Sequence, residues 1–294
     1  GMPDLDYTHE PVAEEMLATA TWWLQDMGAH GFRLDAVKYL IEEGSRLQDT
    51  GATLAFWGRF RDHLDQVAPE AFVVGEAWDR STVAAEYVAA GLPTVFEFDL
   101  AGAMLDGAEQ RSSVPVVTQV DLVREVYPFL RYATFLTNHD QQRVFSQLGE
   151  EVGRNKVAAG LLLTLPGVPF LFYGEEVGMV SSWVHEDVRR PMSWSAGAGA
   201  GFTSGTPWQE PADNHASFNV QAMRPDPDSL WNHYRRLVQA RTASVALRRG
   251  TYHQLETGTA QLLAFLRHHE DQAVVALHNF VAGSLAGWSL STAA

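Results

Sequence analysis

The chain has 294 residues, of which 46% are hydrophobic and 19% are charged, and its formal net charge is −15. This composition supports a sizeable folded core and excludes a disordered chain. The acidic balance argues against nucleic acid as a partner, because phosphate binding requires clustered Lys and Arg. The absence of cysteine excludes disulfides and thiolate metal sites but leaves the cellular compartment open.

Hydrophobic periodicity predicts that helices and strands alternate along most of the chain. The predicted helices cover residues 11–27, 53–67, part of 120–130, 154–165 and 227–241. The predicted strands cover residues 31–36, 72–76, 95–99, 132–137 and 170–173. Because helical connections separate these strands, we expect an α/β fold with a parallel sheet.

The last third of the chain differs from the rest in composition and in hydrophobic pattern. Residues 178–227 are rich in Gly, Ala, Ser and Pro and form a connection far longer than the usual length of about 4 to 6 residues. This stretch is either a loop on the substrate side or a surface segment. Three apolar runs then predict a small antiparallel β module: residues 252–256, 261–269 and 273–280. We expect a first domain over residues 1–245 and a second over residues 246–294.

One uncharged stretch, residues 157–174, is long enough to raise the question of a membrane span. Pro166 and Pro169 break it into helix, turn and strand, so we expect no span. The chain starts without a basic or apolar leader, so no signal peptide is expected in it. Localisation stays open, since the natural N-terminus can lie upstream.

Three polar segments stand at the ends of predicted strands, where barrel enzymes carry their catalytic groups. They are Arg33-Leu34-Asp35 in HGFRLDAVKYL, Glu76 in FVVGEAWD and Asn138-His139-Asp140 in FLTNHDQQR. Side chains alternate along a strand, so Arg33 and Asp35 should face the same side and the guanidinium should favour an ionised Asp35. Two such carboxyl groups suit a retaining glycosidase, in which one attacks the sugar and the other protonates the leaving oxygen.

Each segment also has a structural alternative. Arg33 and Asp35 can form an ion pair without catalytic meaning. Glu76 can cap the segment that follows it, and Asp140 can be the N-cap of the next helix. It is the set of three segments in this order that favours catalysis.

In this order, the three segments resemble conserved segments of the alpha-amylase family, glycoside hydrolase family thirteen. Further segments resemble the same family: Met2-Pro3-Asp4-Leu5, GVPFLFYGEEVGM, RRPMSW and NVQAMRPDPDSLWNHYRRL. The resemblance covers about residues 2–280. It implies a partial (β/α)8 TIM barrel, about strands four to eight, followed by a small truncated antiparallel β module. The chain is then expected to begin in the middle of the barrel.

The resemblance also implies roles for individual residues. Asp35 corresponds to the nucleophile, Glu76 to the acid and base, and Asp140 to a third acid that binds sugar hydroxyls in the transition state. The residues expected to bind substrate are Arg33, Lys38, Tyr39, Asn138 and His139. Many amylases have His after the Lys of this segment, whereas Tyr39 follows Lys38 here.

The activity implied by the resemblance is retaining hydrolysis of alpha-1,4-glucans or malto-oligosaccharides. Glucosidase or transglycosylase specificity is an alternative, and so is an inactive or weak fragment with a structural or sugar-binding role. No metal ligand set is predicted; calcium is common in the family, but near a region that this chain lacks. The open edges of a partial barrel make a second copy of the chain a candidate partner.

Overall fold

The structure is a computed structural model that describes residues 5–292. Three residues of the Met2 to Leu5 segment therefore lie outside the described part. The chain divides into two compact units. The first comprises Gly1–Asp99 and Val123–Ala133, and the second comprises Leu100–Leu122 and Thr134–Ala294.

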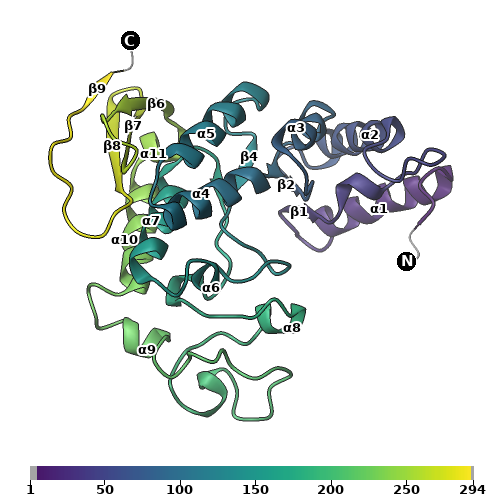
Figure 1. The fold of residues 1–294 in the computed structure, drawn as a ribbon. Coiled ribbons are helices and arrows are strands. Elements are labelled where there is room, and N and C mark those ends of the chain that lie inside the picture. Colours follow the sequence, from purple (N-terminus) through teal and green to yellow (C-terminus); the bar gives the residue numbers. More distant parts are fainter. Residues whose placement is uncertain (1–4, 293–294) are drawn as a thin grey trace. The chain divides into compact units, whose positions relative to one another are not determined.

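The first unit alternates helices and strands (Figure 1). Its elements are α1 (Glu10–Gln25), β1 (Gly31–Leu34), the 3-10 helix η1 (Val37–Tyr39), α2 (Gly51–Val67), β2 (Phe72–Gly75), α3 (Ser81–Ala89) and β3 (Val95–Phe96). Thr50 is the N-cap of helix α2, and its side chain accepts a hydrogen bond from the Thr53 amide. The apolar stripe of α2 is buried, and within it the Trp57 indole donates to the Val37 carbonyl over 2.9 Å. This bond fixes the segment that follows β1.

The strands form the predicted parallel sheet, in the order β1-β2-β3-β4-β5, where β4 is Tyr132–Thr134 and β5 is Val168–Pro169. The register pairs Gly31 with Phe72 and Leu34 with Gly75, so β1 and β2 end at the same level. Gly31 is required here, because a Cβ at this position would lie 1.8 Å from the Phe72 carbonyl oxygen. Parallel strands joined by helices confirm the predicted α/β fold and form part of a (β/α)8 barrel.

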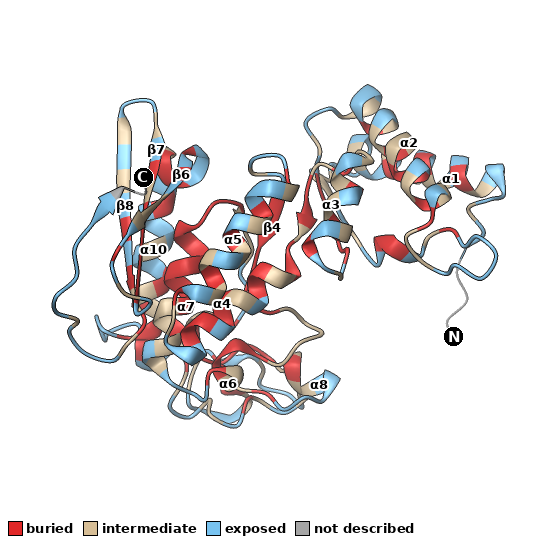
Figure 2. Ribbon diagram, turned by 45° about the horizontal axis from the view of Figure 1, so that its top comes forward, coloured by how far each residue is buried: buried red, intermediate tan, exposed pale blue. Residues whose placement is uncertain are grey.

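The second unit is mostly helical before it reaches a separate sheet. Its helices are α4 (Phe98–Gln110, which starts in the first unit), α5 (Val114–Val126, which ends in the first unit), α6 (Val144–Gln147), α7 (Val152–Thr164), η2 (Glu175–Val177), α8 (His185–Val188), η3 (Ala198–Gly201), α9 (Val220–Met223), α10 (Leu230–Ala243) and α11 (Val245–Arg249). Helix α7 is buried along most of its length, as its red ribbon in Figure 2 shows. From α10, the guanidinium of Arg241 donates to the carbonyls of Leu163, Leu165 and Gly167 at the end of α7.

The C-terminal strands form the predicted antiparallel module. Strands β6 (Thr251–Glu256), β7 (Leu262–His269), β8 (Gln272–Asn279) and β9 (Ser291–Thr292) lie in the order β8-β7-β6-β9. Arg267 on β7 is buried and donates to the Thr164 carbonyl of α7 over 2.6 Å. The division into domains at residue 246 stays a prediction.

Several strands are shorter than predicted, and one is misplaced. Strand β1 ends at Leu34, β3 at Phe96 and β4 at Thr134. The predicted strand over residues 170–173 is wrong, because β5 covers Val168–Pro169. After the Phe170 amide bonds to the Thr134 carbonyl, the chain turns through Gly174, which has a φ of +87°. Helices α3 and α4 were not predicted.

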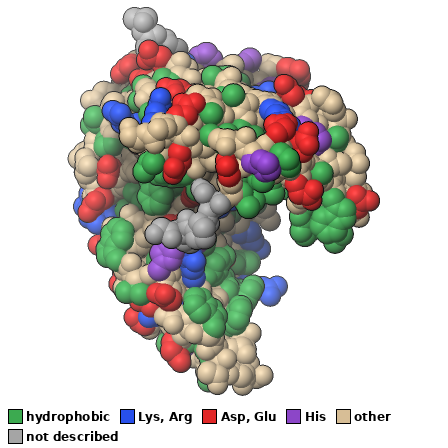
Figure 3. Space-filling view, turned by 90° about the vertical axis from the view of Figure 1, so that its right-hand side faces the viewer, with side chains coloured by type: hydrophobic (Ala, Val, Ile, Leu, Met, Phe, Trp, Pro, Cys, Tyr) green, Lys and Arg blue, Asp and Glu red, His purple; other side chains and the backbone are tan. Residues whose placement is uncertain are grey.

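Acidic side chains are scattered among hydrophobic ones on the face drawn in Figure 3, in keeping with the net charge of −15. Lys and Arg form no continuous patch on the described part of that face. Within residues 5–292, no helix is both long and apolar enough to cross a membrane. In the same residues, no three His, Asp or Glu side chains gather as a metal site.

Candidate functional site

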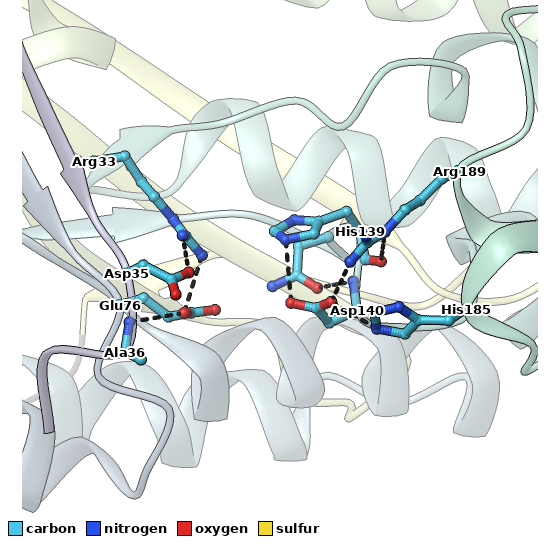
Figure 4. Close-up of polar contacts among 9 residues, drawn as sticks. Arg33, Asp35, Ala36, Glu76, His139, Asp140, His185 and Arg189 are labelled. Atoms are coloured by element: carbon cyan, nitrogen blue, oxygen red, sulfur yellow. Dashed lines mark hydrogen bonds and ion pairs between the residues drawn. The ribbon is translucent and has the colours of Figure 1, made fainter. Parts of the chain in front are cut away.

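The first cluster of candidate residues, called the Arg33 cluster, comprises Arg33, Asp35 and Glu76 (Figure 4). Arg33 comes from β1 and Glu76 directly follows β2, so the matched ends of these strands bring them together. The Arg33 guanidinium forms an ion pair with Asp35 through Nη1. Its Nη2 lies 2.9 Å from Oε2 of Glu76. One guanidinium therefore bridges both predicted catalytic carboxylates.

The backbone after β1 shapes this cluster. Ala36 adopts a left-handed conformation with a φ of 45°, which is uncommon for a residue with a side chain. Its amide donates to Oε2 of Glu76 over 3.2 Å, and the Val37 amide donates to the Glu76 carbonyl over 3.2 Å. The sharp turn explains why the strand stops at Leu34 rather than at the predicted residue 36.

The two carboxylates of the Arg33 cluster have different surroundings. The Asp35 side chain is 75% exposed, whereas the Glu76 side chain is 11% exposed. The Arg33 cluster therefore has one carboxyl group that is open to solvent and one that is shielded from bulk water.

Lys38, which was predicted to bind substrate, is buried. Its ammonium forms an ion pair with Asp79, lies 3.8 Å from Oδ2 of Asp49 and donates to the Trp78 carbonyl over 3.3 Å. The hydrogen bond from Lys38 is the largest cause that lowers the pKa of Asp79. These contacts do not support direct sugar binding by Lys38. They fit a residue that ties η1 to the loop after β2.

Two aromatic side chains near this loop are exposed. Tyr39, also predicted to bind substrate, is 48% exposed, and so is Trp78. The Trp78 ring stacks on Phe98 with centroids 4.7 Å apart and planes 9° from parallel. Sequence reasoning missed Trp78, although it lies two residues after Glu76 in the quoted segment.

The second cluster, called the Asp140 cluster, comprises His139, Asp140, His185 and Arg189 (Figure 4). Oδ1 of Asp140 lies 2.7 Å from Nη2 of Arg189 and 2.9 Å from Nε2 of His185. Oδ2 of Asp140 lies 3.2 Å from Nε2 of His139. The Asp140 carboxylate is thus surrounded by cationic or neutral donors.

The loop after β4 holds the Asp140 cluster in place. The side-chain oxygen of Asn138 accepts a hydrogen bond from the Asp140 amide over 2.9 Å, so Asn138 shapes the loop. Arg189 also donates through Nε to the His139 carbonyl over 3.1 Å. Asp140 is not the N-cap of the next helix, because that position belongs to Arg143.

His185 and Arg189 were not among the predicted site residues. His185 begins the short helix α8, and Arg189 directly follows it. The RRPMSW segment, which starts at Arg189, was the one available signal.

Behind β5, charged groups are buried within the second unit. Arg143 donates to the Tyr173 carbonyl over 2.6 Å, and its guanidinium lies over the Phe172 and Tyr173 rings. Burial, followed by the charge of Glu176, raises the pKa of Glu175 well above its usual range. These groups are enclosed, so they brace the turn after β5 rather than meet a ligand.

Carboxylates at the carboxyl ends of neighbouring parallel strands are the arrangement of a barrel-type α/β enzyme. The family described as "Alpha amylase, catalytic domain" matches residues 1–250. The chain belongs to the alpha-amylase family.

Individual relatives agree with this assignment. The chain is 31% identical over 284 residues to "Alpha-amylase 3" of Dictyoglomus thermophilum, which covers 95% of this chain and 55% of that protein. It is 30% identical over 313 residues to "Trehalose synthase/amylase TreS" of Mycolicibacterium smegmatis, which covers 90% of this chain and 53% of that protein. The chain spans about half of the length of these curated relatives.

A solved structure shows the same fold. The alpha-amylase from H. orenii superimposes with a TM-score of 0.84 at 34% sequence identity. The match covers 96% of this chain and 57% of that one. The predicted membership in the family is therefore confirmed.

Proposed function

We propose that the chain carries the catalytic carboxylates of a retaining glycosidase that acts on alpha-1,4-glucans or malto-oligosaccharides. The observation that supports this most is the single Arg33 guanidinium shared by Asp35 and Glu76. Two carboxylates bound to one guanidinium are held close together. That favours the separation of roughly 5 to 5.5 Å used by retaining enzymes over the about 6.5 to 9.5 Å of inverting ones.

In the first step, a carboxylate oxygen of Asp35 forms a bond to the anomeric carbon while the bond from that carbon to the leaving oxygen breaks. Glu76, which this step requires in its protonated form, gives its proton to the leaving oxygen. In the second step, Glu76 takes a proton from water, whose oxygen displaces Asp35 from the anomeric carbon. The exposure of Asp35 and the enclosure of Glu76 support this division of roles.

We assign Asp140 to the binding of sugar hydroxyls, on the basis of its sequence segment. Its contacts with Arg189, His185 and His139 hold the carboxylate in a fixed orientation. A fixed carboxylate accepts hydrogen bonds from hydroxyls without first losing side-chain freedom. Arg189 and His139 are then the side chains beside Asp140 that contact the same sugar.

A second candidate is transfer of the glucosyl group to another sugar instead of water. The mycobacterial relative, which is named a trehalose synthase and amylase, supports this alternative. The two candidates share the first step and differ only in the acceptor of the second step.

The experiment measures reducing ends released from soluble starch and maltoheptaose by the purified chain and by its Asp35→Asn and Glu76→Gln variants. Glu10→Gln is the matched control, because Glu10 also pairs with an arginine, Arg59, at 2.7 Å. We expect loss of about 1,000-fold or more in the Asp35 variant and unchanged activity in the control. Equal activity in the Asp35 variant would refute the nucleophile assignment.

Two further outcomes separate the alternatives. Chromatography of products from maltose distinguishes glucose, which hydrolysis releases, from trehalose, which transfer forms. A folded chain without either activity would support the alternative of an inactive or weak fragment.

A further inference from the structure

The second unit has a surface hollow of about 540 Å³ that the proposed catalytic residues do not line. It is lined by Trp194, Val220, Gln221, Arg224 and Pro225. The last four residues belong to α9 or directly follow it, and Trp194 comes from the loop between α8 and η3. Figure 1 shows α9 within the long irregular stretch that precedes α10.

Backbone hydrogen bonds fix the two segments that form the hollow. The Gln221 amide donates to the Trp194 carbonyl over 3.0 Å, and the Val220 amide donates to the Ser193 carbonyl over 3.1 Å. The Trp194 amide donates to the Ala200 carbonyl over 2.9 Å. The indole is therefore carried on a backbone that is already ordered, which lowers the entropic cost of binding a ligand.

Asn219 adds a further constraint at the start of α9. Its side-chain oxygen caps the helix by accepting from the Ala222 amide over 2.9 Å. Its side-chain nitrogen donates to the His215 carbonyl over 2.7 Å. Because Asn219 is buried, this cap fixes the position from which Gln221 and Arg224 extend.

The side chains of the hollow combine an aromatic face with hydrogen-bonding groups. Trp194 is 48% exposed, and Gln221 and Arg224 are exposed as well. Among residues 5–292, neither the side-chain amide of Gln221 nor the guanidinium of Arg224 has a polar partner. An indole face packs against the C–H face of a pyranose, while an amide and a guanidinium hydrogen-bond to its hydroxyls.

We propose that Trp194, Gln221 and Arg224 form a second saccharide site that binds a glucose unit of an alpha-glucan chain. The inference rests on the proposed function, because that function supplies a polymer with many identical units. Among the described residues, Arg224 is the one cation that lines the hollow, so the hollow lacks the cluster of cations that recognition of phosphate groups usually requires. Binding at this site holds a long chain to the protein without taking part in bond cleavage.

The test is electrophoresis of the chain in native gels with and without soluble starch, in an Asp35→Asn background that stops turnover. The variant Trp194→Ala is compared with Trp208→Ala, a matched control in which a Trp that is 65% exposed lies outside the hollow. We expect the apparent affinity for starch to fall about fivefold in the Trp194 variant, since a lost aromatic contact has that order of effect. Arg224→Ala should give a smaller loss of about threefold.

Retardation by starch that is the same in the Trp194 variant and its parent would overturn the proposal. So would an equal loss in the Trp208 control. Hydrolysis of maltoheptaose, measured in chains that retain Asp35, tests the proposed function independently of starch binding. If starch retards the chain through Trp194 while no variant hydrolyses maltoheptaose, the saccharide site stands and the catalytic proposal fails.

Discussion

The stability of the second unit should depend on pH through one buried histidine, His278 on β8. The Nε2 atom of His278 lies 3.0 Å from Oγ1 of Thr164 on α7, and its ring stacks on Phe265 with centroids 5.6 Å apart. Burial, followed by the charge of His233, lowers the pKa of His278 from 6.5 to about 4. The neutral ring is therefore the form that the folded protein favours.

The sign and size of the effect follow from this pKa. The unfolded chain binds a proton at His278 near pH 6.5, but the folded chain does so only near pH 4. The stability that the neutral His278 ring contributes is fully present above pH 6.5, and it is lost as the pH falls toward 4. It amounts to about 1.4 kcal/mol by pH 5.5 and to about 3 kcal/mol when fully lost, because each pKa unit corresponds to about 1.36 kcal/mol.

The assay is urea unfolding at about pH 8 and pH 5.5, applied to the parent chain and to His278→Gln. Other groups titrate in the parent and in the variant alike. The difference between their losses of unfolding free energy therefore measures the effect of His278. We expect the parent to lose about 1.4 kcal/mol more than the variant between these pH values. His253→Gln is the matched control, since His253 lies 3.0 Å from a threonine oxygen at an exposed position. An equal pH effect in the parent and the His278 variant would show that His278 does not cause this pH dependence.

Three other substitutions test the packing that supports the site. Arg241→Met leaves three buried carbonyls at the end of α7 without their donor and should cost about 3 kcal/mol, measured by the urea midpoint. An unchanged midpoint would contradict this. Gly31→Ala places a Cβ 1.8 Å from the Phe72 carbonyl oxygen, so we expect a loss of about 3 kcal/mol or more in thermal unfolding, and a stable variant would be evidence against the β1 to β2 register. Lys38→Met removes the main cause that lowers the pKa of Asp79, so that pKa should rise in an NMR titration; a constant value would exclude the ion pair.

The sequence predicted the Arg33 cluster because each of its three residues stands at the end of a predicted strand. The alternation of side chains places Arg33 and Asp35 on one side, and parallel neighbouring strands bring Glu76 to the same level. The left-handed turn at Ala36 was not predictable, because alanine rarely adopts that conformation.

Contacts between distant residues were the ones that sequence reasoning missed. Arg189 reaches Asp140 across 49 positions of the chain, and Lys38 reaches Asp79 across 41. At such separations, no periodic pattern in the sequence predicts that the two residues are in contact. Helix α4 was also missed, because glycine is a poor helix former and Gly107 lies within this helix. The glycine is explained by a contact with Val116 of helix α5, since a Cβ on Gly107 would come within 2.9 Å of the Val116 side chain.

Whether Asp35 is the nucleophile of a retaining glycosidase can be tested by trapping the covalent intermediate. The chain would be incubated with a fluorinated alpha-glucosyl fluoride, which forms the intermediate quickly and releases it slowly, and then digested for mass spectrometry. We expect one added fluoroglucosyl mass on the peptide that contains Asp35, and none in Asp35→Asn. A label on Glu76 or Asp140, or turnover without any label, would contradict the assignment of Asp35 as the nucleophile.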